Sequence, residues 1–465
     1  MKNYLLSLPY MYPVCPISID HARLFVIADI IARYKRINNN VFFPIAAHYS
    51  GVTADEIFDK LKRNDLATMN LYMTYYKMPI TDLSNILSST DLLDYYTEQM
   101  LENFKKLNIS CDYGCFYKTN TSKYQIFVKK LFEKYAENHM IITNNAAELA
   151  IDFNNQEWRK KTYEFIQKIQ FIQKFHRKNI IGSFDTISND FGFLREYGIG
   201  TYYNETQIID PMFDGDFFMI FDLLSKELCL ENYSDEEFEL LVSDVFDAVQ
   251  GREYHNKEIV EHILEWLPCD MFVCEEHLKT WIVKKTFSEV LLMKEEYRTK
   301  EYFITGLGRK NNKRMSSSRG NAILLKNLLD EYGGIKARMI ILMCGGHPSK
   351  NYNFDESVIK LVEDTFSKFE KFMRKEIPLY RKIALSEAEM LKKEEILIKK
   401  NIEDGYFGQA ISLIMQIIPN NYKKILNDTF KMEFAYLCNR YLEILLPGII
   451  DMIYEVTNYK QSREF

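Results

Sequence analysis

The chain has 465 residues, of which 47% are hydrophobic and 27% are charged, a balance typical of folded globular proteins. This length is far above the roughly 100–200 residues of one domain and therefore predicts two or three domains. The formal net charge of −6 excludes an overall basic surface of the kind that drives non-specific nucleic-acid binding. The sequence contains no apolar run of about 20 residues, so we expect no membrane partner and a cytoplasmic location.

Hydrophobic periodicity predicts an α/β fold that begins with a parallel sheet. Residues 3–10 have the pattern of a short strand, residues 19–37 that of an amphipathic helix, and residues 41–46 that of a buried strand. This strand–helix–strand order is typical of a parallel sheet with its ligand site at the carboxyl ends of the strands. Residues 54–145 are predicted to be mostly helical, and residues 155–180 to form one basic amphipathic helix.

The second half of the chain predicts two more strands and then helices alone. The strands are expected near residues 302–308 and 339–345, and a separate helical bundle is expected from Phe354 onward. Of the eight cysteines, Cys111 and Cys115 form the single close pair, and no histidine cluster at zinc spacing accompanies them. We therefore expect reduced structural thiols and no metal site.

Polar residues gather at the predicted start of the first long helix. Ser18, Asp20 and His21 follow an extended loop that contains Pro13 and Pro16. Free backbone N–H groups and the positive end of the helix dipole favour an anion at such a position. An imidazole there can hold phosphate oxygens, although a lone histidine at a helix start is more often structural.

The stretch from His21 to Gly51, "HARLFVIADIIARYKRINNNVFFPIAAHYSG", resembles the first half of the catalytic domain of class I aminoacyl-tRNA synthetases. It is most similar to their leucyl subgroup, in its archaeal and eukaryotic branch. The resemblance implies a Rossmann-like catalytic domain with a parallel sheet, the use of ATP with Mg²⁺, and an aliphatic, leucine-like amino acid. It also implies that the amino acid is bound by Tyr12, Pro13, His48 and Tyr49.

The HIGH signature of that family falls on Ser18, Ile19, Asp20 and His21, so its last histidine is retained. Its first histidine has become Ser18, and the glycine that lets the adenine approach the backbone has become Asp20. The resemblance assigns ATP binding to Ser18, Asp20 and His21. A bulky acidic side chain beside a polyphosphate is unfavourable, so we expect weakened ATP binding.

The stretch "KRMSSSRGN", Lys313–Asn321, resembles the second family signature, KMSKS followed by Gly-Asn. In adenylate formation a carboxylate attacks the α-phosphate, and mobile cations stabilise the charge on the leaving pyrophosphate. Arg314 retains the first cation of the signature, whereas Ser317 replaces its second lysine. Loss of one such charge-assisted contact typically costs about 1.5–3 kcal/mol. Lys310, Lys313 and Arg319 are close enough in sequence to compensate. The resemblance implies catalytic roles for His21, Lys313, Arg314 and Ser317, and ATP binding also by Met315, Ser316 and Ser318.

Two further segments support the resemblance. "CDMFVCEEHLKTWI" is similar to the family segment that meets the adenosine ribose, which implies ATP binding by Cys274, Glu276 and His277. Glu276 stands at the acidic position of that segment, and a carboxylate is suited to it because it can accept hydrogen bonds from both ribose hydroxyls. Cys274 stands at the glycine position of the same segment. "DFGFLREYGIGTYYNETQIIDPMFDGDFFMIF" resembles the archaeal segment that re-enters the catalytic domain, with Arg195 and Asp214 on its polar positions.

The resemblance implies a chain of four parts and a shortened insertion. Members of the family carry a long editing domain at the place that corresponds to residues 142–190 of this chain. Only some fifty residues stand there in this chain, so it is interpreted as a truncated paralogue without that domain. The four parts are a first catalytic half (1–90), a shortened connective insertion (91–210), a second catalytic half with the signature loop (211–350) and an anticodon-binding-like helical bundle (351–465).

Two functions follow from these observations. The first is an enzyme that activates an aliphatic amino acid with ATP and transfers it to tRNA or another acceptor in a specialised pathway. The alternative is a catalytically silent paralogue that binds tRNA, an amino acid or a protein partner. The retained His21, Glu276 and Arg314 favour the enzyme, whereas the replaced signature positions favour the silent paralogue: Ser18, Asp20, Cys274 and Ser317. The candidate tRNA contacts are residues 155–180 and the bundle, and the oligomeric state is left open.

Overall fold

The structure is a computed structural model in which the chain forms two compact units. It describes residues 1–146, 148–171, 173, 175–188, 192–278, 280–378, 385 and 387–458. Unit 1 comprises Met1–Pro16, Lys35–Met100 and Ser110–Thr305. Unit 2 comprises Ile17–Tyr34, Leu101–Ile109 and Gly306–Phe465. Each unit therefore brings together segments that are far apart in the sequence, while the four-part division expected from the sequence stays a prediction.

A five-stranded parallel sheet forms the centre of unit 1. Its strand order is β2 (Asn39–Phe42), β1 (Lys2–Ser7), β10 (Asp270–Cys274), β11 (Glu301–Thr305) and β7 (Gln170–Phe171). The middle strands are rich in buried apolar side chains, as expected for a parallel sheet covered on both faces. The predicted α/β class and the initial strand–helix–strand order are confirmed.

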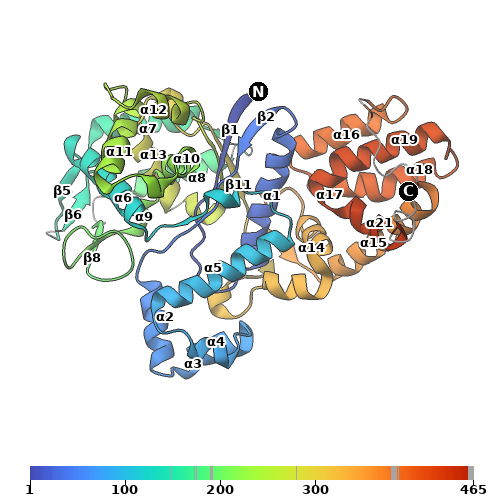
Figure 1. Ribbon diagram of the computed structural model, residues 1–465, viewed down its shortest axis with the longest axis horizontal. Helices are drawn as coiled ribbons and strands as arrows, with labels where there is room; N and C mark the ends of the chain where they lie inside the picture. The colour runs from blue at the N-terminus through green and yellow to red at the C-terminus, as the bar shows by residue number, and fades with distance from the viewer. Residues whose placement is uncertain are drawn as a thin grey trace. The chain divides into compact units, whose positions relative to one another are not determined.

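The helices of unit 1 pack as pairs around an aromatic core. Helix α6 packs on α11, α7 on α13 and α10 on α12, and Figure 1 shows these six helices gathered in one lobe. Ser234 and Glu237 form a capping box at the start of α11, and Gly251 ends that helix in the left-handed conformation. The helices are α2 (Thr53–Lys62), α3 (Leu66–Asn70), α4 (Ile80–Ser84), α5 (Ser89–Lys106, which continues into unit 2 from Leu101), α6 (Ser122–Glu137), α7 (Gln156–Lys168), α8 (Phe175–Thr186), α9 (Pro211–Asp214), α10 (Phe218–Glu227), α11 (Asp235–Gln250), α12 (Lys257–Leu264) and α13 (Trp281–Leu292).

The prediction of one helix over residues 155–180 is wrong. The chain leaves α7 after Lys168, and Gln170 and Phe171 pair with β11 as the edge strand of the sheet. Phe171 stacks on Tyr302 of β11, with 5.9 Å between the ring centroids. Tertiary pairing has thus overridden the helical periodicity, and the chain becomes helical again in α8, with residues 172 and 174 of the predicted helix outside the described residues.

Short two-stranded pairs complete unit 1. Their strands are β3 (Ala46–Ala47) with β4 (Tyr117–Lys118), β5 (Ile141–Thr143) with β6 (Leu149–Ile151), and β8 (Leu194–Arg195) with β9 (Ile208–Ile209). Of these, the β5–β6 hairpin lies, with α7, β7 and α8, in the part of the chain between residues 141 and 186, where the resemblance predicts that the editing domain is absent.

Unit 2 combines one long N-terminal helix with the C-terminal part of the chain. Helix α1 (Ile19–Lys35) belongs to this unit, together with α14 (Leu325–Met343) and a small sheet ordered β13 (Lys313–Arg314), β12 (Gly308–Lys310), β14 (Tyr352–Phe354). Among the described residues after Phe354 the regular elements are all helices, as predicted, and Figure 1 shows these helices packed together. They are α15 (Ser357–Glu376), α16 (Lys392–Glu403), α17 (Phe407–Ser412), α18 (Ile418–Tyr422), α19 (Asp428–Leu437), α20 (Glu443–Leu445) and α21 (Ile449–Asn458).

The strand predicted near residues 339–345 is wrong. Residues up to Met343 belong to α14, which has a kink at Gly333 with φ 71°. A short apolar run fits a buried strand and a buried helical segment equally well. Met339, Ile340 and Ile341 are buried in unit 2, so burial of the helix on several sides explains the run.

Within the described ranges every helix is too short or too polar to span a lipid bilayer.

The buried carboxyl group of Asp216 is expected to make the stability of unit 1 depend on pH. Asp216 is 1% exposed and accepts a hydrogen bond from Ser288, and burial raises its pKa from 3.8 to about 7. The folded protein therefore keeps a proton on Asp216 that the unfolded protein releases. The stability that this proton contributes is complete below pH 3.8 and is lost as the pH rises through about 7. Between about pH 5 and 6.5 we expect the free energy of unfolding to fall by about 2 kcal/mol.

Urea unfolding followed by tryptophan fluorescence measures this dependence, because all three tryptophans lie in unit 1: Trp158, Trp266 and Trp281. Asp216→Asn should flatten the slope, since the amide oxygen still accepts from Ser288 without titrating. Asp59→Asn, which changes an exposed carboxylate of the same unit, should leave the slope unchanged. An unaltered slope in Asp216→Asn would show that other groups cause the dependence.

Candidate functional site

The start of helix α1 is hydrogen-bonded to the segment that follows the signature loop (Lys313–Asn321). The Ile19 N–H donates to the Ile323 carbonyl at 2.9 Å, and the Leu325 N–H donates to the Ile17 carbonyl at 2.8 Å. Ser18 and Leu324 form the antiparallel bridge between these two contacts. Two motifs that lie about 300 residues apart in the sequence are therefore neighbours within unit 2.

His21 is exposed at this helix start. Its Nδ1 lies 3.3 Å from the Ser18 hydroxyl, which restricts the orientation of the imidazole ring. The dipole of the first helical turn favours an anion at the same place. Contact of this imidazole with phosphate oxygens stays a prediction.

The Asp20 carboxylate is turned toward strands β12 and β14. Tyr352 donates its hydroxyl to Asp20 Oδ1 at 2.6 Å, and the Gly308 N–H donates to Oδ2 at 3.1 Å. A Cβ atom on Gly308 would lie 2.2 Å from Asp20 Oδ1, so this contact requires glycine. Burial raises the pKa of the Asp20 carboxyl, and the hydrogen bond from Tyr352 opposes that shift. The Asp20 side chain thus fills the space between the helix start and the small sheet.

The signature loop has a defined conformation held by Asn321. The Asn321 Oδ1 accepts from the Ser316 N–H at 2.8 Å, and its Nδ2 donates to the Arg314 carbonyl at 3.0 Å. Gly320 adopts φ 65°, a left-handed conformation that favours glycine. Met315 is 5% exposed and anchors the loop. The Gly320-Asn321 pair therefore shapes the loop itself.

The serines and cations of the loop differ in exposure. Ser316 and Ser318 share a hydrogen bond at 3.0 Å, whereas the Ser317 hydroxyl is buried with no hydrogen-bond partner among the described residues. The segment Gly306–Leu329 contains no acidic residue. Its exposed cations are Arg309, Lys313, Arg314, Arg319 and Lys326, of which Lys326 pairs with Asp330 at 2.6 Å.

Replacing Asn321 by alanine is expected to loosen the loop. The change removes two hydrogen bonds that join Ser316 to Arg314, worth about 0.5–1.5 kcal/mol each, so local opening should rise about tenfold. Initial rates of trypsin cleavage after Arg314 and Arg319 measure this opening. Ser318→Ala, which removes one exposed hydroxyl contact, is the control and should change the rates less than about twofold.

The residues that are predicted to bind the amino acid belong to unit 1 and differ in solvent exposure. His48 is partly exposed, and its Nε2 lies 2.9 Å from Asp214 Oδ1. Burial raises the pKa of Tyr12 to about 12, and its hydroxyl accepts from the Ala54 N–H at 2.9 Å. The Tyr12 and His48 ring centroids are 6.4 Å apart, so the two side chains are neighbours.

Pro13 and Tyr49 are both buried. Tyr49 donates its hydroxyl to Asp94 at 2.6 Å and lies 2.9 Å from the Thr97 hydroxyl. The Tyr49 hydroxyl is therefore held by Asp94 and Thr97, and direct contact of this hydroxyl with a ligand stays a prediction.

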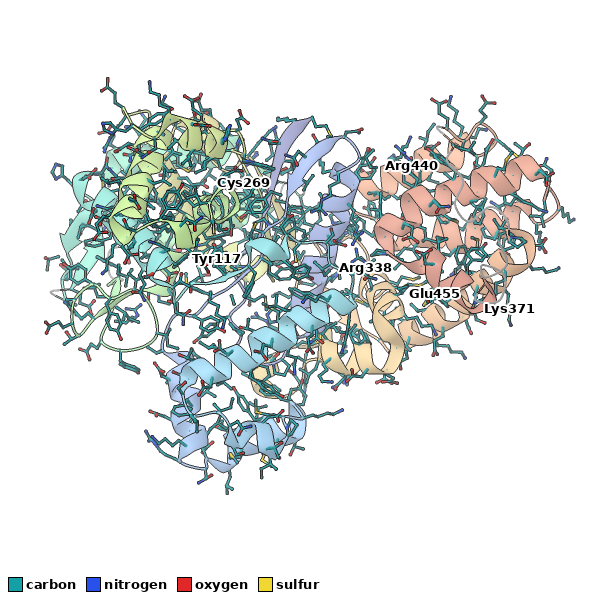
Figure 2. All side chains as sticks on the ribbon, in the orientation of Figure 1. Tyr117, Cys269, Arg338, Lys371, Arg440 and Glu455 are labelled. Carbon is teal, nitrogen blue, oxygen red and sulfur yellow. The ribbon has the colours of Figure 1, made fainter. Side chains whose placement is uncertain are left out.

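Sequence reasoning missed Tyr10 and Asp222 in the same region of unit 1. Tyr10 donates to Asp222 Oδ1 at 3.3 Å and packs on Phe218, with ring centroids 4.7 Å apart. Tyr117, labelled in Figure 2, donates to the same carboxyl oxygen at 2.9 Å. Burial raises the pKa of Asp222 well above its ordinary value, which favours a neutral carboxylic acid. The available signal was a run of acidic residues inside the apolar stretch "IIDPMFDGDFFMIFD".

The predicted ribose segment follows strand β10. The Cys274 N–H donates to His277 Nδ1 at 3.3 Å, and the His277 ring lies 6.2 Å from the Trp281 ring. Glu276 stands on the short helical turn Glu275–Leu278. Cys274, Glu276 and His277 thus belong to unit 1, whereas Ser18, Asp20, His21 and the signature loop belong to unit 2.

Among the described residues, no group of three or more histidine, cysteine, aspartate or glutamate side chains is arranged to hold a metal ion.

Sequence comparison finds relatives over part of the chain. Leucine–tRNA ligases match over about 140 residues: that of Archaeoglobus fulgidus is 27% identical over 142 residues, and that of Thermoplasma acidophilum is 29% identical over 146. Each match covers 30% of this chain and only 15% or 16% of the relative's own length. No protein-family model matches the chain.

Structural comparison extends the likeness to nearly the whole chain. A solved structure of Mycobacterium tuberculosis methionyl-tRNA synthetase in complex with methionyl-adenylate superposes with a TM-score of 0.60 at 11% sequence identity. The superposition covers 98% of this chain and 91% of that chain. At this identity the likeness establishes the fold.

Proposed function

Because this chain is a homologue of the class I aminoacyl-tRNA synthetases and is leucyl-type in sequence, we propose that it activates an aliphatic amino acid with ATP. The product is an aminoacyl adenylate, from which the acyl group passes to tRNA or to another acceptor. One observation carries the proposal: the helix start with His21 and the signature loop with its cations are hydrogen-bonded neighbours in unit 2.

The residues of each unit, taken separately, retain the chemistry that the resemblance assigns to them. His21, Lys313 and Arg314 would hold the phosphates, which ATP brings with Mg²⁺, and cations there stabilise the charge on the leaving pyrophosphate. Glu276 would accept the ribose hydroxyls, and Tyr12 with His48 would contact the amino acid. These assignments extend the resemblance in the sequence to positions whose chemistry is retained.

A specialised pathway is the proposed setting. A hydrophobic pocket distinguishes leucine from an analogue that differs in one methylene group through a free-energy difference of only about 1–3 kcal/mol. This difference is too small for accurate translation without editing. The described part of the insertion consists of a hairpin, two helices and an edge strand, which supports the proposed absence of an editing step.

Pyrophosphate exchange with a panel of amino acids tests the proposal. We expect an aliphatic amino acid to support exchange, and ATP to raise the melting temperature of the protein. If no amino acid supports exchange and ATP gives no thermal protection, the enzyme proposal is lost.

The position of Asp20 favours the second candidate, a catalytically silent paralogue. Its carboxylate accepts the Gly308 N–H and the Tyr352 hydroxyl, so protein groups occupy the place where the family's glycine leaves room for adenine. Such a protein would bind tRNA, an amino acid or a partner protein without adenylate chemistry.

A gel shift with total tRNA, at several salt concentrations, tests tRNA binding in either candidate. Neutralisation of RNA phosphates by cations releases counterions, so binding should weaken steeply as salt rises. Binding without salt dependence would argue against tRNA as the partner.

A further inference from the structure

A cavity of about 440 Å³ lies in unit 2, where α17 packs on both α14 and α16. Figure 1 shows α16 and α17 next to each other in the helical bundle. The apolar part of the lining is formed by Met343 at the end of α14, Leu397 on α16, and Leu413 and Ile417. The segment Leu413–Ile417 is a π-helix between α17 and α18, a rare conformation that is frequent at functional sites. A volume of this size is typical of a small-molecule site.

The polar part of the lining consists of uncharged side chains. Asn401, Tyr406, Gln409 and Ser412 line the cavity, and none of the described lining residues has an acidic or basic side chain. Asn401 is half-buried and Gln409 is exposed, so both amide groups are open to a ligand. A charged group would find no counterion among these residues, and the lining therefore suits an uncharged molecule.

Backbone contacts at the junction of α16 and α17 hold the polar side chains in place. The Tyr406 N–H donates to the Asn401 carbonyl at 2.7 Å, and the Gln409 N–H donates to the Tyr406 carbonyl at 3.0 Å. Gly405 allows the turn between the helices with φ 80°, a left-handed conformation that favours glycine. The buried His347 ring packs against the Tyr406 ring at about a right angle, with 5.3 Å between the centroids. Tyr406 remains 37% exposed, which leaves part of its ring accessible.

These groups match the chemistry of a purine base. An aromatic ring offers a stacking surface for a base. A side-chain amide offers one donor and one acceptor, which pair with the adjacent N7 and N6 amine of adenine. A nucleotide or an RNA strand would also bring phosphate groups, for which the described lining residues supply no cation.

We propose that this cavity binds free adenine or its nucleoside, with the base stacked on Tyr406 and hydrogen-bonded to the amide of Asn401 or Gln409. The site lies wholly within unit 2 and is separate from the residues assigned to the nucleotide in the proposed function. It does not depend on adenylate formation, because it rests on the lining of the cavity alone.

Calorimetric titration of the full chain with adenosine tests the proposal. We expect a dissociation constant of about 0.1 mM, which is ordinary for a ligand of this size. Inosine has nearly the same shape but presents two acceptors to the amide, so its binding should be about tenfold weaker. At least one of Asn401→Leu and Gln409→Leu should remove this preference for adenosine, because leucine fills similar space without the amide.

Variants of Tyr406 test the stacking contact. Tyr406→Ala should weaken the binding of adenosine about tenfold, because the stacking surface is lost. Tyr406→Phe keeps the ring and should change the affinity less than about twofold. The matched control is Tyr197→Ala, which removes an exposed ring of unit 1 and should also change the affinity less than about twofold.

Hydrogen exchange resolved by peptide locates the bound adenosine. Amides of residues 401–413 should exchange more slowly when adenosine is present, and Tyr406→Ala should abolish this protection. Protection confined to residues 274–278 would place adenosine at the predicted ribose segment of unit 1 and reject the cavity. Because no step of these measurements requires catalysis, they can support the site even if pyrophosphate exchange is absent.

Four other results would overturn the proposal: no binding of adenosine, an unchanged affinity in Tyr406→Ala, equal affinities for adenosine and inosine, or displacement of adenosine by total tRNA. The last result would assign the cavity to an unstacked base of an RNA strand. A preference for adenosine that persists in both Asn401→Leu and Gln409→Leu would reject the hydrogen bonds to the amides.

Discussion

Replacing Arg338 by methionine is expected to lower the free energy of unfolding of unit 2 by about 3–5 kcal/mol, because it leaves a buried carboxylate without its main cation. Arg338, labelled in Figure 2, is 1% exposed, and its Nη2 lies 2.5 Å from Asp29 Oδ2. Its Nε donates to the Leu445 carbonyl at 2.8 Å and its Nη1 to the Leu107 carbonyl at 3.2 Å. One guanidinium group therefore joins α14 to three other segments of unit 2.

Hydrogen exchange resolved by peptide measures this loss, because all three tryptophans lie in unit 1 and fluorescence does not report on unit 2. Amides of α1 and α14 should exchange faster in Arg338→Met. Lys371→Met removes an exposed cation of the same unit and is the control, with an expected change below about 1 kcal/mol. The double variant Arg338→Met with Asp29→Leu should recover part of the loss, since an apolar pair can replace a buried ion pair. A loss below about 1 kcal/mol in Arg338→Met would contradict the role of this residue as the central contact.

Replacing Asp20 by glycine is expected to lower the KM for ATP by up to about a thousandfold, provided that the protein catalyses exchange. A carboxylate about 4 Å from a phosphate charge costs about 4 kcal/mol at an effective dielectric constant of 20, and its removal also frees the Gly308 N–H. Combining Asp20→Gly with Ser317→Lys restores both signature positions and should raise exchange further.

The variant Asp20→Asn separates charge from bulk. The amide keeps an acceptor for the Gly308 N–H but has no negative charge. If the KM for ATP falls equally in Asp20→Asn and Asp20→Gly, the effect is due to the charge of the carboxylate. If the KM falls in Asp20→Gly alone, the effect is due to the space that the side chain occupies. If the exchange rate is measurable and neither variant changes it, the alignment of Asp20 with the family's glycine is wrong.

Local patterns in the sequence were sufficient for several features. The first strand, the long helix and the second strand were predicted because their hydrophobic periods differ and each lies between clear turn residues. The helical end of the chain was predicted for the same reason. The two signature motifs were recognised because their order and residue types survive, although Asp20 and Ser317 depart from the pattern.

Other features depended on contacts between distant segments. Residues 155–180 have a helical period, but pairing of Gln170 and Phe171 with β11 converts part of them into an edge strand. Residues 339–345 could be a strand or a helix by composition, and α14 extends through most of them because helix packing buries the run.

By itself, the sequence determined the fold class, the family resemblance and the chemical types of the candidate residues, because these depend on local periodicity and motif order. The tertiary structure alone decided what those residues touch. Asp20 meets Gly308 and Tyr352, and Arg309 stands beside Arg314 through strand register. Such partners are set by long-range packing and hydrogen bonding, which the spacing of residues along one chain does not encode.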